Sequence, residues 1–138
     1  MEIEKLKEKI TGIEPGVVFE ESGGFLHAIV EPSKGFSLIE RLNKDPELKF
    51  DWLTCLTCVD WNQFFYVTYF LRSLELKHEL VVKVKITDRA NPITESVTKI
   101  WAGAELLERE VYDLFGIKFH GHPDLRRILL DEQCNGLP

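Results

Sequence analysis

Hydrophobic and polar residues alternate along this chain with two different spacings, and these spacings predict where helices and strands lie. Apolar residues in segment 3–10 recur at near-helical spacing among alternating charges, which predicts a helix that Gly12 ends. A second, short helix is expected to open at Pro32, with its apolar residues on one side. The pair Asp45-Pro46 should break that helix.

Other segments are rich in β-branched and aromatic residues and are predicted to be strands. The expected strands are 17–20, 25–30, 50–59, 64–71 and 79–87. The first two are expected to form a hairpin. The second strand, the helix that opens at Pro32 and the third strand would then form a βαβ-like unit at the start of the chain. The fourth strand is apolar on both faces and is therefore expected in the middle of a sheet. The fifth alternates, which predicts one core face and one mostly solvated face.

The clearest predicted helix spans residues 104–115. Its apolar residues fall at helical spacing and form one stripe: Ala104, Leu107, Val111, Leu114 and Phe115. Gly116 follows directly, where a left-handed residue commonly ends a helix, and Ile117 can supply the accompanying hydrophobic contact. Glu105 and Arg109 are four residues apart in the favourable order and are expected to pair on the exposed side.

Two residues of this helix do not fit a simple amphipathic pattern. At about 100° per residue, Leu106 falls toward the polar side, near Arg109 and Asp113. Glu110 falls at the margin of the apolar stripe. An exposed leucine alone needs no explanation. A leucine among charged residues on a short helix favours a surface that faces a partner over one that only faces water.

Beyond this helix the chain is expected to form an extended, charged loop. Pro123 restricts its own backbone and pushes His122 into an extended conformation. Asp124 can accept hydrogen bonds from nearby backbone amides in a turn. Arg126 and Arg127 add positive charge, and guanidinium groups suit paired contacts with carboxylates at interfaces.

Length and composition point to one soluble domain, and the order of the predicted helices and strands makes its class α+β. The 138 residues are 44% hydrophobic and 29% charged, which is typical of a globular chain with one core. The net charge of −6 argues against nucleic-acid binding. No run approaches the roughly 18 apolar residues of a membrane span, and the N-terminus lacks the apolar region of a secretion signal. We therefore expect a protein on the cytoplasmic side, with residues 1–138 folded as a mixed or antiparallel sheet with helices packed on it.

The three cysteines do not form a disulfide framework. Cys55 and Cys58 form a C-x-x-C pattern, which can bind zinc or carry redox chemistry. In a strand, residues three apart point to opposite faces, so these two sulfurs are not expected to share a metal. Both are expected to be buried, reduced and structural.

An enzymatic interpretation has little support in this sequence. It would recruit His120, His122, Asp124 and Glu110 as catalytic or metal-binding residues, yet no H-E-x-x-H spacing is present. A rigid turn at Pro123 explains the same residues. The chain contains no Gly-x-Gly-x-x-Gly or Walker pattern and no nucleophile elbow. We therefore predict no catalytic, cofactor-binding or metal-binding residue.

The segments 108–119 and 122–129 resemble the signature of the 30-kilodalton (C-type) subunit family of proton-pumping NADH:quinone oxidoreductase (respiratory complex I). Counterparts in related membrane-bound hydrogenases share it. The signature reads E-R-E-x-aromatic-D-hydrophobic-aromatic-G-I-x-F, then, after a short gap, H-P-D-L-R-R-I-L, and this chain matches it almost without a break. Looser similarity reaches back to about residue 50. Members of the family continue with a further basic segment and often a long tail, whereas this sequence stops at Pro138.

The resemblance implies a non-catalytic α/β subunit of the peripheral arm, without a cofactor, on the cytoplasmic side of the cell membrane. It would pack against the large quinone-site (or nickel–iron) subunit and the iron–sulfur subunits. The candidate interface and signature residues are Leu106, Glu108, Arg109, Glu110, Tyr112, Asp113, Gly116, His122, Pro123, Asp124, Leu125, Arg126 and Arg127. The alternatives are the equivalent subunit of a membrane-bound hydrogenase and an independent protein-interaction domain.

The two arginines of the loop lead to one specific hypothesis. Arg126 and Arg127 are expected to pair with carboxylates, one on the 105–113 helix and one across the interface with a partner. Arg127→Ala should then weaken assembly and leave the isolated domain folded. If the isolated Arg127→Ala domain failed to fold, the loop would make contacts only within the domain and none with a partner.

Overall fold

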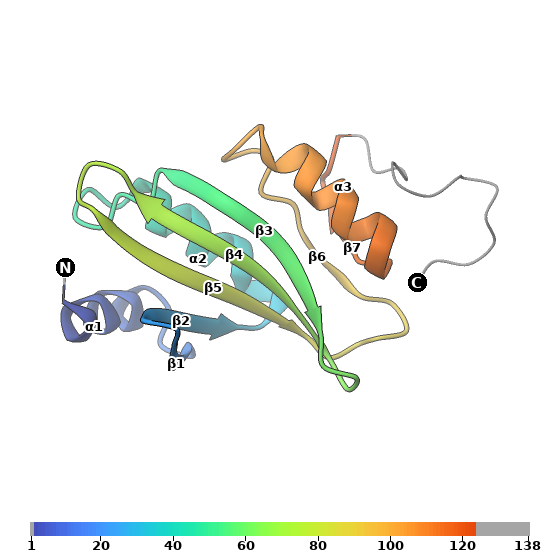
Figure 1. Ribbon diagram of the computed structural model, residues 1–138, viewed down its shortest axis with the longest axis horizontal. Coiled ribbons are helices and arrows are strands. Elements are labelled where there is room, and N and C mark those ends of the chain that lie inside the picture. The colour runs from blue at the N-terminus through green and yellow to red at the C-terminus, as the bar shows by residue number, and fades with distance from the viewer. Residues whose placement is uncertain (1, 124–138) are drawn as a thin grey trace.

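The computed structural model describes residues 2–123, in which three helices and seven strands are arranged as shown in Figure 1. The helices are α1 (Ile3–Ile13), α2 (Pro32–Lys44) and α3 (Ala104–Phe115). The strands are β1 (Val18–Ser22), β2 (Phe25–Val30), β3 (Trp52–Asp60), β4 (Phe65–Ser73), β5 (His78–Ile86), β6 (Ile93–Glu95) and β7 (Lys118–His120). The predicted α+β class is confirmed.

Five of the strands form one mixed sheet in the order β1-β2-β5-β4-β3. Strands β3, β4 and β5 follow one another as antiparallel neighbours, whereas β2 pairs with β5 in parallel. The βαβ-like opening is therefore only partly right, because β5 and β4 lie between β2 and β3. Strands that follow one another in the chain and are joined by short turns usually pair, as β3, β4 and β5 do. The other edge of β5 then pairs with β2.

The three helices pack on one face of this sheet and cover its core. Strand β5 turns Leu80, Val82, Val84 and Ile86 toward them, as its alternation predicted. A Cβ atom at Gly35 of α2 would lie 2.7 Å from a methyl carbon of Val84, so glycine permits the close approach of α2 to β5. Figure 1 shows α2 behind β4 and β5, and no helix of residues 2–123 in front of them.

Several boundaries differ from the predicted ones for local reasons. Helix α1 continues past Gly12, and the amide of Glu14 donates to the carbonyl of Ile10. A single glycine in the last turn costs only about 1 kcal/mol, so it does not end the helix. The short parallel pair of β6 and β7 was not predicted, since three-residue strands are too short to show a periodicity.

The two cysteines of β3 lie on opposite faces of the sheet. Cys58 is buried under the helices, whereas Cys55 is exposed on the other face. The prediction that both are buried is therefore wrong for Cys55. Its physical reason is that the helices cover only one side of the sheet. Burial raises the pKa of the Cys58 thiol to about 12, which keeps that sulfur protonated.

Candidate functional site

Helix α3 buries charged residues and exposes leucines, the reverse of a typical amphipathic helix. Glu108 is 0% exposed and Arg109 is 8% exposed, and Asp113 is also fully buried. Leu106 is 59% exposed and Leu114 is 45% exposed. Charged side chains are rarely buried unless they are bonded, so the buried side of α3 is expected to contain specific polar contacts.

The Glu108 carboxylate makes the central contact. It accepts a hydrogen bond from the Ser96 hydroxyl at 2.6 Å and another from the backbone amide of Val97 at 2.8 Å. Burial raises the pKa of Glu108, and these two hydrogen bonds and the nearby His122 oppose the shift. The carboxylate therefore fastens α3 to the segment that leaves β6.

Ser96 connects this carboxylate to two further segments. Its oxygen accepts a hydrogen bond from the amide of Thr98 at 3.1 Å and lies 2.8 Å from the Thr98 hydroxyl. The backbone amide of Ser96 donates to the carbonyl of His120 at 2.9 Å. The end of β6, the end of β7 and the middle of α3 are thus held in one network.

The turn after β7 is fastened to α3 as well. Nε2 of His122 donates to the backbone carbonyl of Glu105 at 2.9 Å. His120 points elsewhere, and its Nδ1 lies 2.9 Å from the Glu95 carboxylate. These two histidines therefore contact different groups. Pro123 is exposed and is the last residue described.

Gly116 ends α3 as predicted, with a left-handed φ of 74°. Its amide donates to the carbonyl of Tyr112 at 2.8 Å, and the neighbouring Ile117 is fully buried. The stop and its hydrophobic contact therefore fix the direction in which the chain leaves the helix.

The remaining predicted site residues fall on several sides of α3. Glu110 is exposed and Tyr112 is half-buried. Arg109 and Asp113 were expected on the exposed side and are buried, and no ion pair joins Arg109 to Glu105 within residues 2–123. The physical reason is the bonding of Glu108, which turns the helix so that its neighbours face inward. Four predicted residues lie outside the described residues: Asp124, Leu125, Arg126 and Arg127.

Three exposed residues on α3 form a line that we call the α3 ridge: Leu106, Glu110 and Leu114. They are spaced by four positions and so lie along one side of the helix. The placement of Leu114 corrects the prediction, which assigned it to the buried stripe. Leu106 is exposed, and its contact with a partner stays a prediction.

The α3 ridge adjoins a cavity of about 610 Å³ at the end of the helix. Leu114 and Phe115 line one side, and Arg89 and Asp60 line another. Nitrogen atoms of Arg89 lie 2.7 and 3.2 Å from the two carboxylate oxygens of Asp60, and its guanidinium lies 4.3 Å from the ring centre of Phe65. Sequence reasoning missed this pair, because its members are 29 positions apart and no local pattern connects them.

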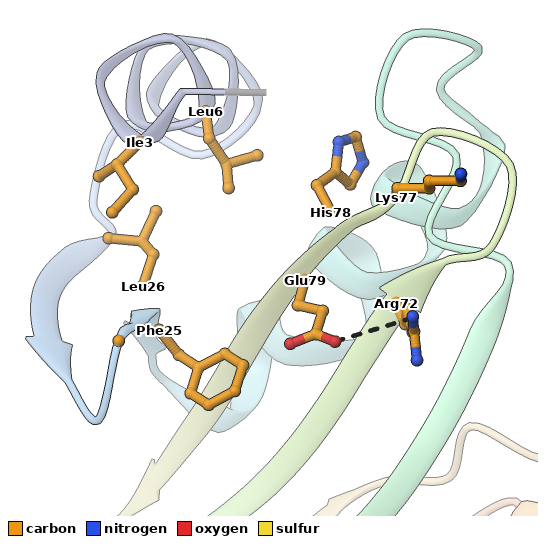
Figure 2. Close-up of a pocket in the computed structure, with 9 residues that line it drawn as sticks. Ile3, Leu6, Phe25, Leu26, Arg72, Lys77, His78 and Glu79 are labelled. Carbon is orange, nitrogen blue, oxygen red and sulfur yellow. Dashed lines mark ion pairs between the residues drawn. The ribbon is translucent and has the colours of Figure 1, made fainter.

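A second cavity, of about 260 Å³, lies between α1 and the ends of β4 and β5 (Figure 2). The ion pair between Arg72 and Glu79 spans 3.7 Å on one side of it, and Phe25 lies beside Glu79. His78 is bonded through Nε2 to the carbonyl of Leu48. These polar groups stabilise the end of the sheet and are already engaged with protein partners.

Comparison with known proteins gives one consistent family. Residues 28–138 match the family model described as the respiratory-chain NADH dehydrogenase, 30 Kd subunit. The chain is 40% identical over 121 residues to the C subunit of NADH-quinone oxidoreductase from Roseiflexus castenholzii, which covers 86% of this chain and 69% of that protein. It is 36% identical over 141 residues to the C subunit from Azorhizobium caulinodans, covering 99% of this chain and 66% of that protein.

Two further matches concern a longer protein and a solved structure. The chain is 44% identical over 89 residues to the C/D subunit of NADH-quinone oxidoreductase from Phocaeicola vulgatus, covering 64% of this chain and 17% of that protein. A chain in the structure of the membrane-bound sulfane sulfur reductase, an archaeal respiratory membrane complex, superposes with a TM-score of 0.77. That match covers 94% of this chain and 78% of the other at 23% identity, and it shows a shared fold. Among the helices of residues 2–123, none has the length and apolar character needed to cross a membrane.

Proposed function

Because the chain belongs to the family of the respiratory-chain NADH dehydrogenase 30 Kd subunit, we propose that it is a subunit of the peripheral arm of a complex I-like NADH:quinone oxidoreductase. In this proposal it docks onto the large quinone-site subunit and the iron–sulfur subunits on the cytoplasmic side of the membrane. It contributes contacts that hold the arm together, and it carries no reacting group or cofactor of its own.

The observation that carries the proposal is the α3 ridge. Scattered exposed leucines are ordinary, but Leu106 and Leu114 flank Glu110 in one line on a helix whose other charged residues are buried or face its sides. Apolar residues at i and i+8 around a polar one suit a helix face laid against a complementary groove. The adjoining cavity, with Leu114 on its wall, extends the same surface.

The buried polar contacts of α3 have a supporting role in this proposal. The bonds of Glu108 to Ser96 and Val97 set the rotation of the helix, and His122 holds the start of the charged loop against it. A helix with a fixed rotation presents its leucines in one orientation, which lowers the entropic cost of docking. The pairing of Arg126 and Arg127 with carboxylates stays a prediction.

An affinity pull-down from detergent-solubilised host membranes tests the proposal. The tagged chain should recover a large hydrogenase-like subunit together with iron–sulfur subunits, and the remaining proteins would identify the electron donor. Recovery of the chain alone, or only with unrelated soluble proteins, would contradict the proposed function.

A pair of variants tests the ridge separately. Leu106→Asp should lower the recovery of partner subunits at least tenfold, because it places a charge in an apolar contact. Leu74→Asp is the matched control, since Leu74 is also exposed but lies in the turn after β4. Circular dichroism should show both variants folded. Full recovery with Leu106→Asp would remove the ridge from the docking surface.

A further inference from the structure

The two edge strands of the five-stranded sheet, β1 and β3, differ in length and in charge. Strand β1 has five residues, and its Glu20 and Glu21 lie 3.9 and 3.5 Å from lysine nitrogens. Strand β3 has nine residues and carries no charged side chain before its last residue, Asp60. Proteins usually keep edge strands short or charged, because an edge exposes backbone groups that can pair with another strand. Strand β1 follows this rule, and β3 does not.

The outer edge of β3 is open. Its neighbour in the sheet is β4, and among residues 2–123 no backbone hydrogen bond joins its other edge to another segment. A bulge at Thr54 interrupts the pairing with β4, and the register from Cys55 to Asp60 is then regular. In an antiparallel strand about half of the residues point their N–H and C=O groups away from the paired neighbour. Segment 55–60 is therefore a regular edge whose outward backbone groups have no partner strand.

Large apolar side chains are exposed along this edge. Trp52 is the first residue of β3 and Trp61 directly follows its last, and each is more than half exposed. Val59 lies between them and is exposed as well. Tryptophan is enriched among the residues that contribute most to protein interfaces. The edge and both of its ends therefore have the composition of a contact surface.

Helix α3 follows β3 from one end to the other. The indole nitrogen of Trp101, just before α3, donates to the carbonyl of Asp51 at 3.0 Å. At the other end, the ring centre of Phe115 lies 6.3 Å from that of Phe65, which pairs with Asp60. Helix α3 packs against β3, and Figure 1 shows it on the side of β3 away from β4. A strand added at this edge would therefore run along α3 as well.

The position of α3 argues against a second copy of this chain at the edge. Copies related by a two-fold axis meet through the same surface, so the two β3 strands would pair in one continuous sheet. Paired strands lie about 4.8 Å apart. The two α3 helices would then come within about 5 Å of each other, whereas the axes of packed helices lie about 8–10 Å apart. A single extended segment with no helix behind it avoids this clash.

The edge of β3 is continuous with the α3 ridge. The cavity of about 610 Å³ is lined by Asp60, at the end of β3, and by Leu114 of the ridge. A subunit bound at the ridge can therefore reach the edge with an extended segment. This continuity favours a neighbouring subunit of the same assembly over an unrelated protein.

We propose that segment 55–60 at the outer edge of β3 pairs with an extended segment of a neighbouring subunit, which adds a sixth strand to the sheet. This inference rests on the proposed function, because it adds a second contact to the same assembly. Strand addition takes its affinity from main-chain hydrogen bonds and its specificity from alternate side chains. The added strand should be uncharged opposite Cys55, Thr57 and Val59, because none of these side chains can pair with a charge.

Hydrogen exchange of the backbone amides tests the added strand directly. Exchange is followed residue by residue with mass spectrometry, in the free chain and in the complex recovered from membranes. The outward amides of segment 55–60 should exchange at least tenfold more slowly in the complex, at alternate positions, because they become hydrogen-bonded. The amides of β1, at the opposite edge, are the control and should exchange equally in both samples. Equal slowing at both edges would overturn the inference.

The outcomes separate this inference from the proposed function. Recovery of partner subunits with segment 55–60 exchanging at the free rate overturns the inference alone. Recovery of no partner subunit overturns both. Protection of this segment already in the free chain also overturns the inference. The occupant is then a second copy if protection rises with concentration together with a dimer in light scattering, and otherwise a segment of the chain itself.

A matched pair of substitutions tests the edge in the assembled complex. Val59 and Val18 are exposed valines on opposite edge strands, with exposed fractions of 42% and 59%. Val59→Lys should lower the recovery of partner subunits at least fivefold, because lysine on an edge strand opposes pairing. Val18→Lys is the control and should recover them as the parent chain does. The melting temperatures of both variants should lie close to that of the parent chain. Equal recovery with the two variants overturns the assignment of the β3 edge.

Discussion

Helices α2 and α3 pack on the same face of the sheet and are nearly equal in length, with 13 and 12 residues. Their buried sides differ in that only α3 buries charged side chains. Helix α2 buries Leu38, Ile39 and Leu42, and Gly35 brings it into contact with Val84 of β5. Its attachment is apolar contact area, and the free energy of each apolar contact depends little on its direction.

Helix α3 adds directional hydrogen bonds to the apolar contacts of Ala104 and Val111. The Glu108 carboxylate receives the hydroxyl of Ser96 and the amide of Val97, while His122 donates to the carbonyl of Glu105. Hydrogen bonds weaken steeply when their geometry changes, so these contacts set both rotation and position. Leu106 consequently faces outward in one orientation.

The difference teaches how a small domain can combine stability with an apolar docking surface. Apolar residues on α2 stabilise the core, and polar residues on α3 set the orientation of that helix. Buried polar networks contribute less to stability than a well-packed apolar contact of similar size, and they specify geometry more strictly. The two helices should therefore respond differently to substitution.

The largest loss of stability is expected on α2. Leu42 is fully buried, so Leu42→Ala removes apolar contacts and leaves a cavity, which should lower the free energy of unfolding by about 3 kcal/mol. Urea unfolding followed by circular dichroism measures it. Leu76→Ala, at an exposed leucine of the β4–β5 turn, is the control and should change the value by less than about 0.5 kcal/mol. Similar losses for both would mean that α2 does not form the core contact described.

A smaller loss is expected on α3. Glu108→Ala leaves the Ser96 hydroxyl and the Val97 amide without their acceptor, which should cost about 2 kcal/mol. Glu108→Gln keeps one side-chain oxygen and should cost less. Glu110→Ala, on the exposed side of the same helix, should stay within about 0.5 kcal/mol of the parent. Equal effects of the alanine variants would contradict the buried network.

Local patterns were sufficient to predict most of the elements. The bounds of α3 follow from helical spacing and the stop at Gly116, and the core face of β5 follows from alternation. The burial of Glu108 and Asp113 on α3 could not be inferred in this way. Glu108 is buried because Ser96 and Val97 supply its partners from more than ten positions away, and no spacing within the helix reveals that.

The same limit applies to the sheet and its surfaces. The parallel pairing of β2 with β5 joins segments about fifty residues apart, and the pattern of either strand alone permits other neighbours. The exposure of Cys55 depends on the placement of all helices on one face. The exposed Leu106 was predicted, since a leucine among charges is visible within one helical turn.

The pH dependence of stability should distinguish the two helices further. Burial raises the pKa of Glu108 in the folded chain above its ordinary value of 4.5. At a pH between 4.5 and this raised pKa, Glu108 keeps its proton in the folded chain and loses it in the unfolded chain. The free energy of unfolding therefore falls as the pH rises through this window, by at most about 1.4 kcal/mol per pH unit. Glu108→Gln should remove this slope, whereas Leu42→Ala should keep it. Urea unfolding at several pH values from 4.5 upward measures both.

Asp60 should contribute to the pH dependence in the opposite direction. Its hydrogen bonds with Arg89 lower the pKa of this carboxyl below 3.8, so its contribution to stability is present above that value and is lost as the pH falls. The two carboxylates therefore act in separate pH windows. A slope above pH 4.5 that survives Glu108→Gln would show that another titratable group causes it.

The smallest effect on the isolated chain is expected at the α3 ridge. Because Leu106 is 59% exposed, Leu106→Ser should change the free energy of unfolding by less than about 0.5 kcal/mol. Val111→Ser, on the buried side of the same helix, should cost more than about 1 kcal/mol, since it removes apolar contacts and buries a hydroxyl group. Urea unfolding of the two variants measures the contrast. A residue that is neutral in the free chain and needed for recovery of the complex contributes to the contact with a partner. A large loss of stability from Leu106→Ser would instead place this leucine in the fold itself.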